Sequence, residues 1–184
     1  MKSNARLERK FLPALLAGCF IQDAGMIRSG GSVGPKAMPV KSITQAPYRI
    51  AADVTITEEA YAGRLGYFEV AAGAIVTLPR ATGSGAKYEF FCKTTITSNG
   101  MVIKVANADD VMQGIAYVAQ DGGDTIVAFE AGSTADTFTG NGSTTGGIRG
   151  DRVALQDVAP GLFSVTAWLS ATGTEASPFS AAVS

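Results

Sequence analysis

Two pairs of adjacent carboxylates offer the simplest catalytic chemistry in this chain. Glu58-Glu59 and Asp109-Asp110 could supply the acid and the base of a glycoside hydrolase, which needs two carboxyl groups around the scissile bond. Neighbouring residues on a strand point to opposite faces of the sheet, and adjacent acids in a turn are usually solvated. The spacing of both pairs therefore argues against a shared catalytic site.

Clusters of side-chain oxygens could also bind a cation. Asn107, Asp109 and Asp110 form one such cluster, and Asp121 with Asp124 forms a second. Neither has the twelve-residue spacing of a calcium loop, and Asx residues in turns commonly cap their own backbone. We predict turns at both places and no metal site.

Other catalytic residue types are absent or badly placed. The sequence contains no His, which removes the commonest general base and a common metal ligand. Cys19 and Cys92 cannot form a zinc site without His, and Cys92 is expected to be reduced and buried. The segment 30–36 is not a phosphate loop, because Pro35 intrudes and no Ser or Thr follows Lys36. We predict a protein that is not an enzyme and has no cofactor.

Short strands separated by turns are the elements expected to position these groups. The segment ADVTIT, for example, alternates apolar and polar residues as a half-buried strand does. Strands repeating about every 8–12 residues are typical of a β-sandwich or barrel. The predicted strands are Ala52–Thr57, Tyr67–Val70, Ile75–Leu78, Lys87–Thr97, Met101–Val105, Val111–Ala119, Asp124–Glu130, Thr137–Thr139, Arg152–Gln156 and Leu162–Leu169.

One turn predicts a specific strand pairing. Asn99-Gly100 is a favoured pair in type I′ turns, whose two central residues both need positive φ. A hairpin at this turn would place Ile96 opposite Ile103.

The aromatic residues are scattered through the predicted strands. They lack the interleaved basic residues of a single-strand nucleic-acid platform, so no sequence-specific nucleic-acid partner is predicted. Trp168 lies in the last strong strand, where we expect burial in the core or in an interface.

Charge divides the chain into a basic arm and an acidic domain. Residues 1–41 contain seven basic and two acidic side chains, whereas residues 42–184 contain eight basic and fourteen acidic ones. Such an arm would contact nucleic acid, a lipid surface or the acidic face of a neighbouring subunit, or would remain a solvated tail. We predict a partly helical arm with a Gly/Pro-rich connector over residues 1–47, a β-domain over 48–172 and a polar tail over 173–184.

The N-terminal segment also permits an export interpretation. Leu16-Ala17-Gly18-Cys19 is similar to a lipobox, which would make the chain an exported lipoprotein adhesin. The apolar run Phe11–Ala17 before it is short for a signal core, and Pro13 interrupts it. No run approaches the ~18 apolar residues of a membrane helix, so no membrane partner is predicted.

The segment Val76–Gly85 resembles a turn found in virion structural proteins of tailed bacteriophages. An aromatic strand at Tyr88–Phe91, a Ser98-Asn99 turn, and later segments beginning at Gly150 and Gly161 extend the resemblance over about residues 66–172. The family includes head-decoration proteins, head fibres and tail-fibre modules. The resemblance implies a jelly-roll-like β-sandwich, frequently trimeric, without enzymatic activity.

These observations lead to one expected function. The chain is predicted to be an all-β virion protein with a single jelly-roll-like sandwich, located on the capsid exterior after synthesis in the host cytoplasm. It would decorate or cement the head of a tailed phage by binding the major capsid protein or other virion subunits, as a homo-oligomer and preferably a trimer. The arm residues expected to bind are Arg6, Arg9, Lys10, Phe11 and Leu12.

Three alternatives stay open at the level of the sequence. The chain could be a tail, collar or fibre component with the same fold, or the exported adhesin. A glycan-binding module is the third, and exposed Tyr or Trp side chains on one sheet face would favour it.

Overall fold

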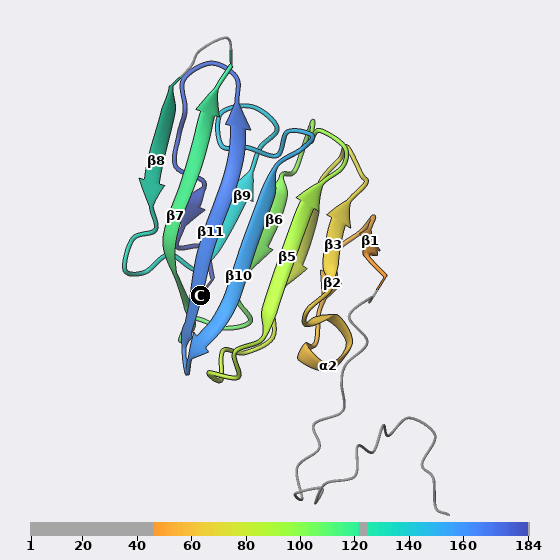
Figure 1. The fold of residues 1–184 in the computed structure, drawn as a ribbon, viewed down its shortest axis with the longest axis vertical. Helices are drawn as coiled ribbons and strands as arrows, with labels where there is room; N and C mark the ends of the chain where they lie inside the picture. The colour runs from red at the N-terminus through yellow and green to blue at the C-terminus, as the bar shows by residue number, and fades with distance from the viewer. Residues whose placement is uncertain (1–45, 122–124, 184) are drawn as a thin grey trace, which may run out of the picture. The chain divides into compact units, whose positions relative to one another are not determined.

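The computed structural model describes residues 46–121 and 125–183, which fold into two packed β-sheets (Figure 1). The prediction of an all-β sandwich is confirmed. The helix in the described part of the chain is the four-residue α2 (Glu58–Tyr61). No helix in this part is both long enough and apolar enough to span a membrane. Residues 1–45, which make up nearly all of the arm predicted to be partly helical, lie outside the described residues.

One sheet has seven strands, in the order β1-β3-β5-β10-β11-β7-β8. The strands nearest the viewer in Figure 1 belong to it. Its elements are β1 (Tyr48–Ile50), β3 (Leu65–Phe68), β5 (Lys87–Cys92), β10 (Arg152–Ala159), β11 (Leu162–Ala171), β7 (Val111–Gln120) and β8 (Ile126–Glu130).

The second sheet has five strands, in the order β12-β9-β6-β4-β2. Its elements are β12 (Phe179–Ser180), β9 (Thr137–Gly140), β6 (Met101–Lys104), β4 (Ala74–Thr77) and β2 (Val54–Thr55). Segment 173–184, predicted as a polar tail, contributes β12, which pairs with β9.

The first six strands alternate between the two sheets along the chain. Odd-numbered strands enter the larger sheet and even-numbered strands enter the smaller one. As a result β1, β3 and β5 are parallel neighbours, and so are β2, β4 and β6. Double-sheet jelly rolls are antiparallel, so this parallel winding is a feature that the jelly-roll prediction did not include.

The predicted hairpin at Asn99-Gly100 is wrong. Both residues have positive φ, 55° and 82°, as a type I′ turn requires. However, β5 and β6 lie in different sheets, so Ile96 and Ile103 do not pair. The chain leaves the larger sheet after Cys92 and crosses the sandwich, and the buried Ile96 donates its amide hydrogen to the Gly147 carbonyl instead.

The space between the sheets contains a continuous apolar core. Its largest fully buried side chains come from both sheets and include Tyr88, Phe90, Phe138 and Phe163. Burial in this core confirms the prediction for Cys92 and raises the pKa of its thiol to about 12.

Candidate functional site

The predicted attachment residues Arg6, Arg9, Lys10, Phe11 and Leu12 lie outside the described residues, as does Cys19. Among the predicted functional residues, the structure describes Trp168 and the two carboxylate pairs. Both concern the seven-stranded sheet and the loops at its ends.

Trp168 is not a core residue. On β11 the side chains of Phe163, Val165, Ala167 and Leu169 are buried, and the alternate residues between them point outward. Trp168 belongs to the outward set, and 58% of its surface is exposed. Of the two environments predicted for Trp168, burial in the core is wrong, and burial in an interface stays a prediction. Strict alternation through FSVTAWL, which places Trp168 in phase with Ser164 and Thr166, was the signal in the sequence.

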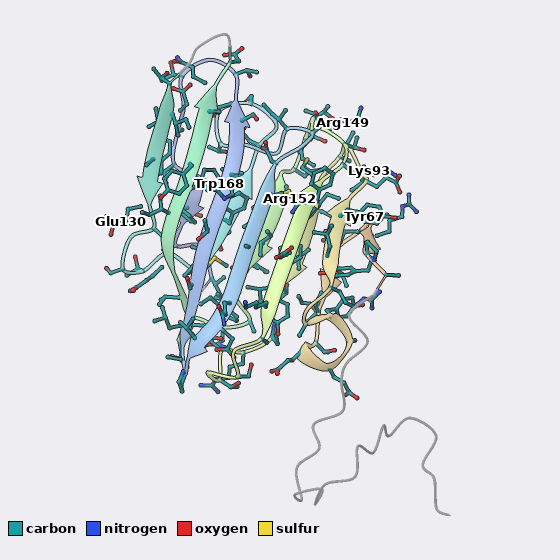
Figure 2. The ribbon with its side chains drawn as sticks, viewed as in Figure 1. Tyr67, Lys93, Glu130, Arg149, Arg152 and Trp168 are labelled. Carbon is teal, nitrogen blue, oxygen red and sulfur yellow. The ribbon has the colours of Figure 1, made fainter. Side chains whose placement is uncertain are left out.

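The exposed indole belongs to a line of side chains that crosses the outer face of the sheet. Strand register places one residue from each of six neighbouring strands directly opposite the next. Figure 2 shows three of its members, from β3, β10 and β11, across the middle of the sheet. We name this line the aromatic row, and it consists of Arg49, Tyr67, Phe91, Arg152, Trp168 and Tyr117.

Contacts within the aromatic row hold its rings in place. The rings of Trp168 and Tyr117 are stacked, with centroids 4.7 Å apart and planes at 19°. The Arg152 guanidinium lies 5.7 Å from the centre of the Phe91 ring. Stacked pairs and cation–π contacts of this kind each contribute about 0.5–1.5 kcal/mol. The row is therefore a partly preorganised surface.

The two halves of the row differ in charge balance. At the β1 end, Glu69 accepts hydrogen bonds from Arg49, at 2.6 Å, and from the Lys93 ammonium, which also lies over the Tyr67 ring. The bond from Lys93, then that from Arg49, holds the pKa of Glu69 below its usual range. Arg152, in contrast, forms no ion pair with any carboxylate in the part of the chain that the structure describes.

Shallow depressions border Trp168 on both sides. One is lined by Leu65, Glu89 and Thr166, and the other by Tyr117 and Ser170. Each combines an apolar surface with hydroxyl or carboxyl oxygens, so a ligand there could be both stacked and hydrogen-bonded.

The carboxylate pairs do not converge on a shared site. Asp109 is exposed and lies 3.9 Å from Arg80. Asp110 is buried, and its Oδ2 accepts hydrogen bonds from the Ala81 amide and from the Asn107 side chain. Asn107 also accepts the Asp109 amide hydrogen, which is the predicted Asx turn.

The other pair has a local role as well. Glu58 and Glu59 form the first turn of α2 and are exposed, where acidic side chains favour the helix N-terminus. In residues 46–121 and 125–183, no group of three His, Cys, Asp or Glu residues is arranged to bind a metal ion. Asp124, one of the predicted turn residues, is outside that part.

Asp157 organises the turn that carries the phage-like motif. Its carboxylate accepts the amide hydrogens of Thr82, Gly83 and Ser84, at 2.7–3.0 Å, and both hydroxyls of that turn. Burial alone would raise the pKa of Asp157, but these hydrogen bonds outweigh it and hold the pKa below its usual range. The Thr-Gly-Ser-Gly turn is therefore a backbone cradle for one of the protein's own carboxylates.

Two further buried aspartates fix loops in a similar way. Asp151 accepts the amide hydrogens of Ile148 and Ser170, and Asp136 accepts those of Ala182 and Val183. Burial raises the pKa of Asp151 to about 6, although its hydrogen bonds oppose the shift. These carboxylates connect segments that are distant in sequence.

Comparisons with protein-family models, with curated proteins and with solved structures found no match for this chain. The candidate functional features are therefore the aromatic row on the outer face of the larger sheet and the buried aspartates that hold the loops.

Proposed function

We propose that this chain is a non-enzymatic structural protein of a tailed-phage virion, in which the β-sandwich decorates or cements the capsid exterior. The observation that supports this most is the cradle around Asp157. The residues of the Val76–Gly85 resemblance meet Asp157 across the fold, so the motif shapes a loop and presents no reactive group. A motif whose residues fix a loop and take no part in a reaction fits a structural subunit.

Attachment is assigned to the N-terminal arm. Its basic and apolar residues would lie along the major capsid protein or another virion subunit, and the sandwich would project from the shell as part of a homo-oligomer, preferably a trimer. An extended arm adds buried area without enlarging the domain, and stable interfaces bury ~1,600 Å² in total. The arm residues assigned to this contact are Arg6, Arg9, Lys10, Phe11 and Leu12.

Copy number tests the position on the particle. Quantitative mass spectrometry of purified particles should find hundreds of copies of this chain, because decoration repeats with the shell lattice. About a dozen copies would assign the protein to a vertex, collar or tail instead. Absence from the particles would overturn the proposal.

Binding to stripped heads tests the arm. The full-length protein should saturate the heads, whereas the triple variant Arg6→Gln, Arg9→Gln, Lys10→Gln should bind at least about tenfold more weakly, because it removes three of the arm's charges. The variant Lys87→Gln, which removes one exposed charge from the sandwich and none from the arm, is the control. Equal binding by all three proteins would refute attachment through the arm.

A further inference from the structure

We propose that the aromatic row is a binding platform for a linear carbohydrate chain that carries carboxylates. This proposal concerns the outer face of the seven-stranded sheet and does not depend on attachment to a capsid. It starts from three physical properties of the row: an exposed indole beside half-buried rings, a length that spans several strands, and an arginine without an acidic partner among the described residues.

The exposed Trp168 indole suits a sugar. A pyranose ring has an apolar face of C–H groups that packs against a flat aromatic side chain, while its hydroxyls remain available for hydrogen bonds. Stacking fixes the rings of Trp168 and Tyr117 and covers one face of each, so the exposed part of the Trp168 indole is the surface that remains for a sugar. An aromatic side chain fixed before binding loses little conformational freedom when it contacts a ligand.

The length of the row suits a polymer. Tyr67 and Tyr117 are separated by four strand-to-strand steps, or about 19 Å at the usual spacing between strands. Several sugar units can lie along that distance. Apolar contact would then come from Trp168, and from the parts of the Tyr67 and Phe91 rings that Lys93 and Arg152 leave open.

The centre of the row is narrow, which favours a sugar over a protein partner. Over the three central strands β5, β10 and β11, the neighbouring line on the same face contains Glu89, Ala154 and Thr166, and the next contains Lys87, Gln156 and Ser164. The apolar surface is therefore about one residue wide over these strands, and it widens over the outer strands at Leu65, Ile115 and Ile126. A standard protein interface covers ~800 Å² on each partner around a broad apolar centre. Hydroxyl, amide and carboxyl groups beside a narrow strip instead match the hydroxyls of a sugar.

The charges favour an acidic sugar. Arg152 lies between Phe91 and Trp168 in the row, and a guanidinium binds a carboxylate through two parallel hydrogen bonds. Arg149, just before β10, adds positive charge beside the row, and Lys93 and Arg49 together outnumber the one carboxylate, Glu69, that they share (Figure 2). Glu89 and Glu130 lie in the next line, so the positive charge is concentrated on the row itself.

An oligosaccharide array tests the proposal with the full-length protein. The array carries oligomers of galacturonic acid, the same oligomers as methyl esters, and neutral oligoglucosides. The protein should bind the acidic oligomers, and esterification should weaken binding about tenfold, because it removes the charge that pairs with Arg152. Trp168→Ala should lower the affinity at least about tenfold. Arg152→Gln should remove the preference for the acid over its ester.

Two variants on the other sheet serve as matched controls. Val102→Ala and Lys104→Gln change half-buried residues of β6, and both should bind like the wild type. Thermal unfolding checks that every variant is folded. The proposal fails if no oligosaccharide binds, or if Trp168→Ala leaves binding unchanged. It also fails if sedimentation shows that Trp168→Ala only dissociates an oligomer, because the face would then be an interface between copies.

Discussion

Arg152 and Asp157 lie on the same strand, but one charged group is exposed and the other is buried. The Asp157 carboxylate is buried at the end of the sandwich and accepts five hydrogen bonds from one turn. The Arg152 side chain lies on the outer face of the sheet, between the exposed Trp168 indole and the half-buried Phe91 ring, and forms no ion pair in the described chain. The buried charge of Asp157 stabilises the fold, whereas the charge of Arg152 on the outer face of the sheet remains available to a ligand.

The largest predicted effect on stability comes from removing the buried Asp157 carboxylate. Asp157→Ala should reduce the free energy of unfolding by about 4 kcal/mol, because three backbone amides and two hydroxyls lose a charged acceptor. Urea unfolding measures this change. The control Asp109→Ala should cost less than about 0.5 kcal/mol, since that carboxylate is exposed and only weakly paired. Similar losses in the two variants would contradict the assigned role of Asp157.

The second prediction uses the pH dependence of Asp151. Its folded pKa of about 6 exceeds the usual value near 4, so the folded state holds the proton more tightly than the unfolded state. Its contribution to stability is therefore greatest below pH 4 and is lost, by about 3 kcal/mol in total, as the pH rises through 6. Carbon-detected NMR of the carboxyl group should give the pKa, and unfolding at several pH values should give the slope. A stability that rises through this window would contradict the prediction.

Asp157 should show the opposite sign. Its folded pKa is held below the usual value, so its contribution is complete above pH ~4 and is lost as the pH falls through the folded pKa. The two aspartates therefore provide an internal comparison within one titration.

Much of the strand content could be predicted from the sequence, because alternation and turn residues are local signals. The segments Met101–Lys104 and Val111–Gln120 were predicted to within one residue at each end. The parallel winding was not predicted, because the pairing of β3 with β5 joins strands separated by other elements and leaves no local pattern. The Asn99-Gly100 turn shows the limit: its backbone conformation was predicted, but the partners of the flanking strands were not.

The candidate site was less predictable still. Alternation in β11 could have placed Trp168 outside, but no local pattern brings Tyr117, Arg152 and Phe91 into line with it. Their alignment depends on the register of strands that are far apart in the chain. The acceptor at Asp157 for the Thr82–Ser84 turn has the same explanation.

The third prediction concerns the contribution of Trp168, on the outer face of the seven-stranded sheet, to stability. Trp168→Ala should cost about 1 kcal/mol or less, because the exposed indole contributes mainly its stack with Tyr117. A double-mutant cycle with Tyr117→Ala should give a coupling energy of similar size. A loss above about 3 kcal/mol would mean that the indole supports the core and is not held for a ligand.

The smallest predicted effect on stability is at the β1 end of the row. Glu69→Gln should change the free energy of unfolding by less than about 0.5 kcal/mol, because the side chains that pair with it are exposed. The same change leaves Arg49 and Lys93 without their shared carboxylate, so the row gains positive charge. Binding of oligogalacturonate should strengthen about two- to threefold at low salt, and the gain should disappear at 0.5 M NaCl, where screening is strong. Weaker binding by this variant would show that Glu69 positions those cations for the ligand and does not compete with it.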